Sequence, residues 1–241
     1  MPEPAASGTN AAAAWPAAAR LIGRWLDRRE RADELLETLP SGLAGIGRAR
    51  CQHLVYGVIR HFGRLEAELG RLVSHAPRFA VRGALFVAGF ELIEAASRAA
   101  ATPPDGGVAE PGAAAAAEQT GQVARIVHHA VEQTKHLASP AEARLVNAVV
   151  RRLAAALDMP PPPRLASATL LAGYFSHPEW LVRRWLTQFG AEPTRRLLEW
   201  NQQPAPLHAR WRPAAGGAEP PDWFKPTPWP GFFELPPGRW N

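Results

Sequence analysis

Proline is concentrated in the last third of this 241-residue chain, where it limits regular structure. Sixteen of the 25 prolines lie at or after Met159. Because proline has no backbone N–H and disrupts helix interiors, long helices are expected only before this point. Seven of the nine tryptophans also lie at or after Trp180. The distribution predicts helices in the first two thirds, followed by short helices and extended, proline-punctuated chain.

The first two thirds carry apolar residues at helical spacing. The longest such run, Ile46 to Val73, is long enough for two helices with a bend near His61–Gly63. Ser139 followed by Pro140 is typical of an N-cap with proline at the first helical position. The expected helices cover residues 11–29, 32–39, 46–73, 78–96 and 119–135, with one more after Ser139.

These helices predict an all-α bundle over residues 11–158. Residues 1–10 are expected to be a disordered N-terminus. Residues 99–117 contain Pro-Pro-Asp-Gly-Gly, Pro-Gly and five consecutive alanines, with almost nothing large to bury. We therefore expect a flexible surface insertion at 99–117.

The chain after the bundle begins with a stiff run, Pro160–Pro163. We interpret residues 159–170 as a proline-rich linker. In residues 171–241 we expect a helix that starts at Ser176–Glu179, a short helix over 191–201 and one strand within 205–211. About 40 residues follow Pro204, too few for a complete α/β domain.

Several classes of protein are disfavoured by simple features of the sequence. The single cysteine, Cys51, excludes an internal disulfide framework and a cysteine-based zinc cluster. No stretch approaches the ~18 apolar residues of a transmembrane helix, and residues 1–10 lack the basic start of a signal peptide. We expect a cytoplasmic protein with no membrane partner.

Residues suited to catalysis or cofactor binding are scarce. Gly42, Gly45 and Gly47 have a spacing similar to that of a glycine-rich cofactor-binding turn. Such a turn follows a strand, and no strand precedes these residues, so a loop between helices is the better interpretation. Adjacent His128 and His129 project about 100° apart on a helix and do not form a metal pair. Cys51 fits a buried small apolar residue. We expect no catalytic residue, no metal and no cofactor in this chain.

Arginine is the better indication of function, because the net charge is +5 and 25 of the 27 basic residues are arginine. Guanidinium groups pair with phosphate through two parallel hydrogen bonds and track RNA backbones. Acidic residues between positions 30 and 37 partly neutralise the region, so an ordinary solvated surface remains an alternative. The candidate RNA-binding residues are Arg20, Arg24 and Arg28 on one face of the first helix, then Arg48, Arg50, Arg60 and Arg64.

Five segments, taken in order, resemble helices of NusB-like domains. His53–Arg60 resembles the family's "L-(V/C)-x-G-V-(L/I)-R" helix, and Arg64–Leu69 resembles its "L-D-x-x-L" element. Val87–Ile93 resembles the next helix, and Ala130–Glu132 with Leu145–Arg152 resembles the last two. The resemblance implies a helical bundle that binds RNA.

Two later segments resemble ribosomal RNA cytosine-C5 methyltransferases of the Sun/Fmu (RsmB) type. Ser176–Trp185 is similar to their "S-H-P-x-W-L-(V/L)-x-R-W" segment, and Leu198–Arg210 is similar to "N-N-x-x-P-P-x-x-x-R-x-N". Arg212 departs from the family by standing in place of its usual asparagine. The resemblance adds Arg183 and Arg184 to the candidate RNA-binding residues.

The resemblance implies the N-terminal, RNA-recruiting region of an S-adenosylmethionine-dependent 16S rRNA methyltransferase. The family's glycine-rich cofactor turn and its two catalytic cysteines have no counterpart here, so we expect an incomplete methyltransferase part over 171–241 and no methyl transfer by this chain alone. The alternative is a NusB-type transcription antitermination module that docks a ribosomal protein. The resemblance of residues 176–210 to the methyltransferases disfavours that alternative.

Overall fold

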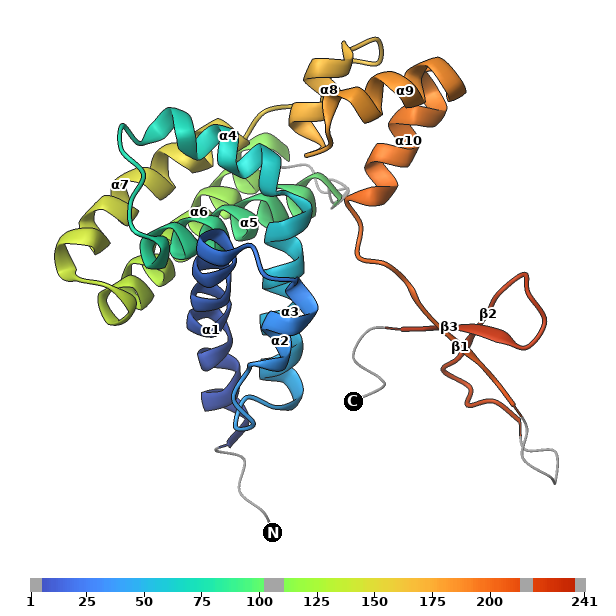
Figure 1. Cartoon of the computed structure of the whole chain (residues 1–241), viewed down its shortest axis with the longest axis horizontal. Coiled ribbons are helices and arrows are strands. Elements are labelled where there is room, and N and C mark those ends of the chain that lie inside the picture. The colour runs from blue at the N-terminus through green and yellow to red at the C-terminus, as the bar shows by residue number, and fades with distance from the viewer. Residues whose placement is uncertain (1–5, 102–110, 213–218, 237–241) are drawn as a thin grey trace. The chain divides into compact units, whose positions relative to one another are not determined.

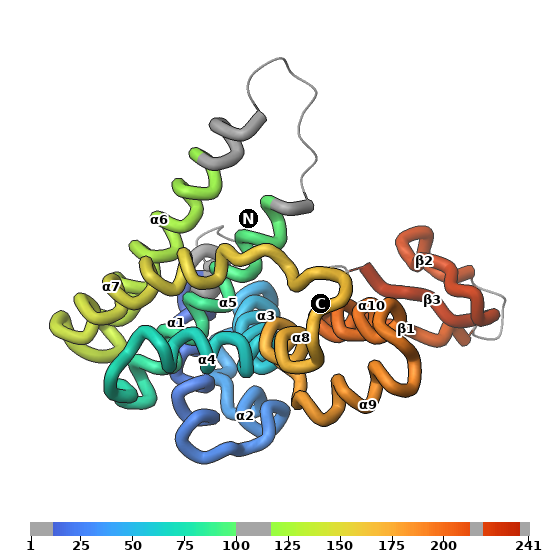
Figure 2. The backbone as a smooth tube through the Cα atoms, turned by 90° about the horizontal axis from the view of Figure 1, so that it is seen from above, coloured from blue at the N-terminus to red at the C-terminus, as the bar shows by residue number. Residues whose placement is uncertain are grey.

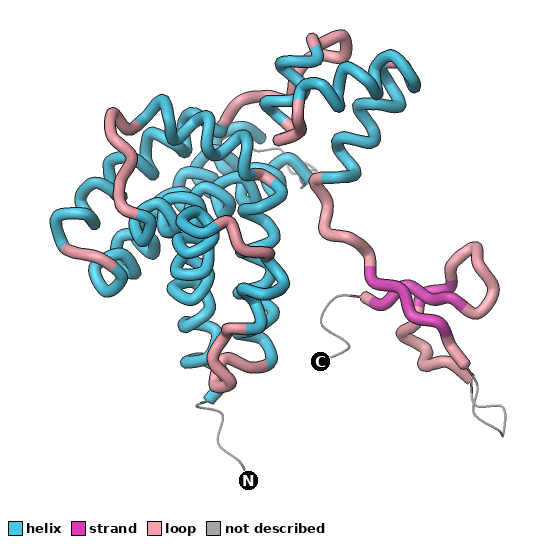
Figure 3. The backbone as a smooth tube through the Cα atoms, viewed as in Figure 1, coloured by secondary structure: helices cyan, strands magenta, loops and turns pink. Residues whose placement is uncertain are grey.

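The computed structural model describes residues 6–101, 111–212 and 219–236 of the chain. These residues form ten helices and three short strands, so the fold is all-α, as predicted. The chain divides into two compact units, residues 1–202 and 203–241. The described helices belong to the first unit and the described strands to the second (Figure 3).

Seven helices build the bundle of the first unit, and three shorter ones follow (Figure 1). The predicted long run is indeed two helices, which meet at His61. The bundle consists of α1 (Ala6–Arg28), α2 (Ala32–Glu37), α3 (Gly45–Arg60), α4 (Phe62–Leu72), α5 (Phe79–Ala101), α6 (Pro111–Leu137) and α7 (Pro140–Leu157). The helices after it are α8 (Ala168–Tyr174), α9 (Glu179–Phe189) and α10 (Ala191–Asn201).

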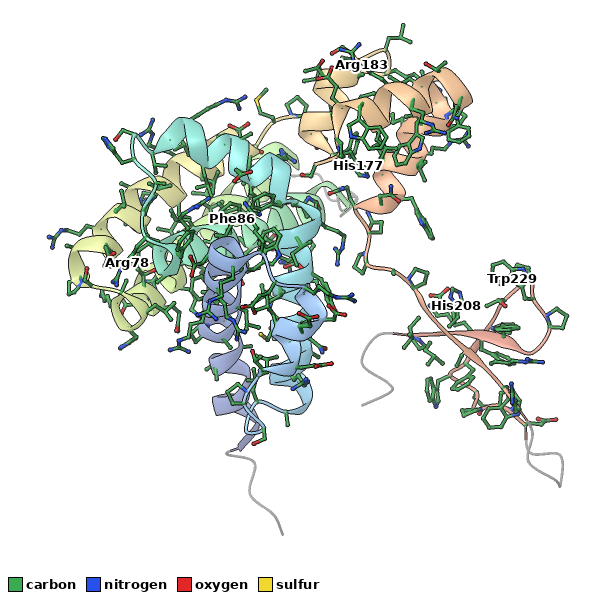
Figure 4. The ribbon with its side chains drawn as sticks, in the orientation of Figure 1. Arg78, Phe86, His177, Arg183, His208 and Trp229 are labelled. Carbon is green, nitrogen blue, oxygen red and sulfur yellow. The ribbon has the colours of Figure 1, made fainter. Side chains whose placement is uncertain are left out.

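Helix α5 is the central element of the bundle. From Val81 to Phe90 every residue except Arg82 is buried, and the helix packs against α1, α3, α4, α6 and α7. A helix that is apolar on all sides can only be stable inside a protein. Figure 2 shows α5 enclosed by its neighbours, and Figure 4 labels Phe86 within this core.

The crossing of α1 and α5 depends on two glycines. A Cβ atom at Gly83 would lie 2.1 Å from the Ala19 carbonyl oxygen and 2.9 Å from the Gly23 nitrogen. A Cβ atom at Gly23 would lie 2.8 Å from the Phe79 carbonyl oxygen. These neighbours are backbone atoms that cannot rotate away, so only glycine permits this approach of the two helices.

The sequence-based boundaries differ from the structure around the expected insertion. Helix α5 continues to Ala101 and α6 already begins at Pro111, so residues 99–101 and 111–117 of the expected insertion are helical. Alanine has the highest helix propensity, and proline is well tolerated at a helix start. Residues 102–110 lie outside the described residues, as do residues 1–5 of the expected disordered N-terminus; residues 6–10 belong to α1.

Helix α8 is not predicted by the sequence pattern and starts inside the expected linker. The Ser167 side chain accepts a hydrogen bond from the Leu170 amide at 3.3 Å and caps the helix. Its apolar face packs against α9 and α10 in a small second core around Leu171, Phe175, Val182 and Leu198. The short length of α8, seven residues, gives little periodicity from which to predict it.

The second unit contains a three-stranded antiparallel sheet. Its strands are β1 (Leu207–Arg210), β2 (Lys225–Pro226) and β3 (Phe232–Leu235), in the order β1-β3-β2. The sequence pattern predicts only β1. Aromatic contacts between Trp211, Phe224 and Phe233 support the sheet.

The close helix crossing yields a stability prediction. We expect Gly83→Ala to lower the free energy of unfolding by about 2–3 kcal/mol, because the new methyl group overlaps the backbone of α1. Gly121→Ala in α6 is the matched control, since no atom lies within 4 Å of the position that its Cβ would take. There we expect a gain of about 1 kcal/mol from helix propensity. Urea unfolding of both variants measures the difference, and equal effects would contradict the proposed crossing.

Candidate nucleic-acid interface

The three arginines on α1 differ in their surroundings. Arg20 is exposed and makes no hydrogen bond or ion pair with any described residue. Arg24 pairs with Glu30 at 2.6 Å, and Arg28 contacts the same carboxylate at 3.5 Å. Glu30 therefore neutralises part of the basic face that the sequence predicted on this helix.

Two arginines of α3 connect helices of the bundle. Arg48 donates a hydrogen bond to the Leu36 carbonyl at the end of α2, at 3.2 Å. Arg50 pairs with Glu91 on α5 at 2.8 Å, and it lies 3.6 Å from Glu94. Both side chains therefore stabilise contacts within the fold.

Arg60, at the end of α3, is half-buried and has no ion pair with a described residue. Burial lowers the pKa of its guanidinium, which still stays protonated at neutral pH. A cation that is removed from water in this way, without a carboxylate partner, is well placed to gain from a bound anion.

Arg64 joins the bundle to the helices that follow it. Its guanidinium donates a hydrogen bond to the Leu157 carbonyl at 2.9 Å and lies 4.2 Å from the centre of the Tyr174 ring. Its backbone amide, in the first turn of α4, donates to the Ser176 hydroxyl at 2.9 Å. Amides in a first helical turn have no partner within the helix, so Ser176 acts as a cap from a distant part of the chain.

The two arginines on α9 are both exposed. Arg183 forms an ion pair with Glu179 one turn earlier, at 2.8 Å from its Nε atom. Arg184 has no ion-pair partner among the described residues and faces solvent. Of the nine predicted residues, the structure leaves Arg20, Arg60 and Arg184 without a polar partner in the described chain.

Helix α7 presents basic residues that the sequence spacing did not single out. Arg144, Arg151 and Arg152 are exposed and form no ion pair with a described residue. The one carboxylate within α7, Glu142, is bound by Arg78 through two hydrogen bonds of 2.5 and 2.7 Å (Arg78 is labelled in Figure 4). Counting charges helix by helix would have found this surface, because α7 has three arginines and one glutamate.

The residues of the two later motifs contact one another. The Asn201 amide donates to Nε2 of His177 at 3.1 Å, and Gln202 donates to the Phe175 carbonyl at 2.8 Å. Together with the Ser176 cap, these bonds connect α4, the start of α9 and the end of α10. The motif residues that the sequence singled out therefore have structural roles at this junction.

Comparison of the chain with protein-family models, with curated proteins and with solved structures gives no match. The family resemblance accordingly rests on the sequence motifs. None of the helices in the described part of the chain is both long and apolar enough to cross a membrane.

The glycine run that the sequence singled out lies at the connection between two helices. Gly45 begins α3 with a φ of 51°, and the segment before it is a turn after α2, with no strand. Among the described residues, no three His, Cys, Asp or Glu side chains are placed to hold a metal ion. Cys51 is fully buried, and burial raises the pKa of its thiol to about 11, so it is protonated at neutral pH.

His61, at the junction of α3 and α4, is the most strongly perturbed histidine of the described chain. Burial, with a further contribution from Arg60 and Arg64, lowers its pKa to about 4. The ring stacks on Phe90 with centroids 5.7 Å apart, and its Nδ1 atom is buried without a hydrogen bond. The folded protein therefore holds this imidazole neutral.

This burial predicts a pH-dependent stability. In the unfolded chain a histidine takes up its proton near pH 6.5, whereas in the fold it does so near pH 4. Acid therefore favours unfolding, and His61 should lower the free energy of unfolding by about 2 kcal/mol between pH 7 and pH 5. His61→Phe should flatten this dependence in urea titrations. The exposed control His75→Gln should not, and an equal effect of both variants would disprove the assignment.

Proposed function

We propose that this chain binds RNA and serves as the rRNA-recruiting region of an S-adenosylmethionine-dependent 16S rRNA (cytosine-C5) methyltransferase of the Sun/Fmu (RsmB) type. The order of the sequence motifs supports the methyltransferase class. We assign no step of methyl transfer to residues of this chain. RNA binding is supported chiefly by one observation, the uncompensated positive charge of α7.

The arginines of α7 are suited to phosphate for an electrostatic reason. An arginine that already holds a carboxylate must exchange one anion for another, so its net gain on binding phosphate is small. Arg144, Arg151 and Arg152 have no carboxylate to give up among the described residues. The same reasoning favours Arg20, Arg60 and Arg184 over the paired Arg24, Arg28, Arg50 and Arg183.

The second candidate function is a protein-docking module of the antitermination type. It is favoured by large exposed aromatic side chains on α9 and α10, Trp180 at 65% and Trp200 at 62% exposure. Such side chains are enriched in protein interfaces. A ribosomal protein is the partner that this alternative implies.

The proposed function is tested by the salt dependence of RNA binding. We expect the full chain to bind 16S rRNA transcribed in vitro, with an affinity that falls steeply between 50 and 200 mM salt. The triple variant Arg144→Ala, Arg151→Ala, Arg152→Ala should reduce the slope of log K against log salt by about 3, roughly one for each lost phosphate contact.

A charge-matched control separates local contacts from net charge. Arg31, Arg71 and Arg164 are each paired with a carboxylate, namely Asp33, Glu68 and Glu192. Replacing these three by alanine removes the same formal charge and should leave the slope nearly unchanged. A loss of the same size in both triple variants would refute the α7 surface. Capture of a ribosomal protein without salt-sensitive RNA binding would favour the docking module.

A further inference from the structure

A groove of about 540 Å³ lies between the bundle and the segment that begins α9. Trp25 of α1 and Phe62 of α4 line one side, with their ring centroids 4.9 Å apart and their planes perpendicular. The other side is formed by α8 and by residues 176–179, which include His177, labelled in Figure 4. A volume of this size falls within the range of pockets that take small organic ligands.

The charge around this groove is positive. The Arg29 guanidinium lies 5.0 Å from the centre of the Trp25 ring and 5.3 Å from that of Phe62. Arg29 is exposed and has no ion pair with a described residue, and the unpaired Arg60 follows the lining residue Ile59. Glu179, a carboxylate of the lining, is held by Arg183. The groove therefore combines aromatic surface with one uncompensated cation, Arg29.

Backbone strain is located at the same place. Arg29 and Ser176 are the two non-glycine residues of the described chain with positive φ, 56° and 55°. Arg29 directly follows the end of α1, a position where glycine takes this conformation at little cost. Its guanidinium covers the aromatic pair, and Ser176 lines the groove. Strained residues of this kind cluster at ligand-binding sites, where the surrounding structure holds them in place.

We infer that this groove binds one unpaired nucleotide of single-stranded RNA, with the base stacked against Arg29, Trp25 and Phe62. Unpaired bases are recognised by stacking on aromatic rings and on guanidinium planes, and their phosphates by free cations. The Ser176 hydroxyl accepts one hydrogen bond, from the Arg64 amide, and keeps its own proton to donate to a base edge. This inference rests on the proposed RNA-binding function.

The decisive variant is Arg29→Gly, because it removes the guanidinium and at the same time relieves the positive φ. We therefore expect it to fold at least as stably as the wild type. The probes are a fluorescein-labelled 12-nucleotide oligouridylate and a 12-base-pair RNA duplex, measured by fluorescence anisotropy with the full chain. Arg29→Gly should weaken binding of the single strand about tenfold and of the duplex less than twofold, since bases in a duplex are not free to stack on the protein.

Further variants separate stacking from charge. Trp25→Leu should also weaken single-strand binding, and Arg29→Lys, which keeps the charge but not the plane, should fall between Arg29→Gly and the wild type. The control Arg196→Ala, on the exposed face of α10, should stay within twofold of the wild type for both probes.

The outcomes distinguish this inference from the proposed function. Single-strand affinities within twofold of the wild type for both Arg29→Gly and Trp25→Leu would overturn the groove as a nucleotide site. Equal losses of affinity for the single strand and the duplex would also overturn the groove as a nucleotide site, because they would mean that only net charge matters. If the α7 triple variant loses RNA affinity while Arg29→Gly does not, the groove inference alone fails. If the wild type binds neither probe nor 16S rRNA, both fail.

Discussion

The contact between α1 and α5 at Gly23 and Gly83 is the constraint on which the bundle depends. Backbone atoms of the two helices approach so closely that neither position has space for a Cβ atom. This approach places α1 along one side of α5, whose remaining sides are covered by α3, α4, α6 and α7. The apolar surface of α5 is thereby removed from water on every side, which supplies the main driving force for the fold.

A second constraint connects the bundle to the helices after it. Ser176 caps the start of α4 across 112 residues of sequence, and Arg64 packs on Tyr174. The Ser-His-Pro segment stands out in the sequence by its resemblance to a family. Its contacts give it a structural role, because it satisfies a helix amide that would otherwise lack a partner.

Charge compensation decides which arginines are available for a ligand. Six of the nine predicted arginines hold a carboxylate or a carbonyl group of the described chain, and three of these six, Arg48, Arg50 and Arg64, reach another helix. The sequence correctly indicated that Arg20, Arg24 and Arg28 share a helix and that acidic residues from position 30 onward partly neutralise it. The structure adds that Glu30 pairs with Arg24 and Arg28. A charge count over α7 would have indicated its excess of arginine, but only the tertiary structure shows that these arginines have no carboxylate partner among the described residues.

The sequence by itself determined the helical class, most helix positions, the break at His61 and the Ser139 cap, whose hydroxyl accepts from the Glu142 amide at 3.3 Å. These are local properties, set by apolar periodicity, capping and propensity over a few residues. Only the tertiary structure decided the glycine crossing of α1 and α5, the pairing of each arginine, and the groove beside Trp25 and Phe62. Each of these joins atoms that are far apart in the chain, and no local pattern encodes their distances.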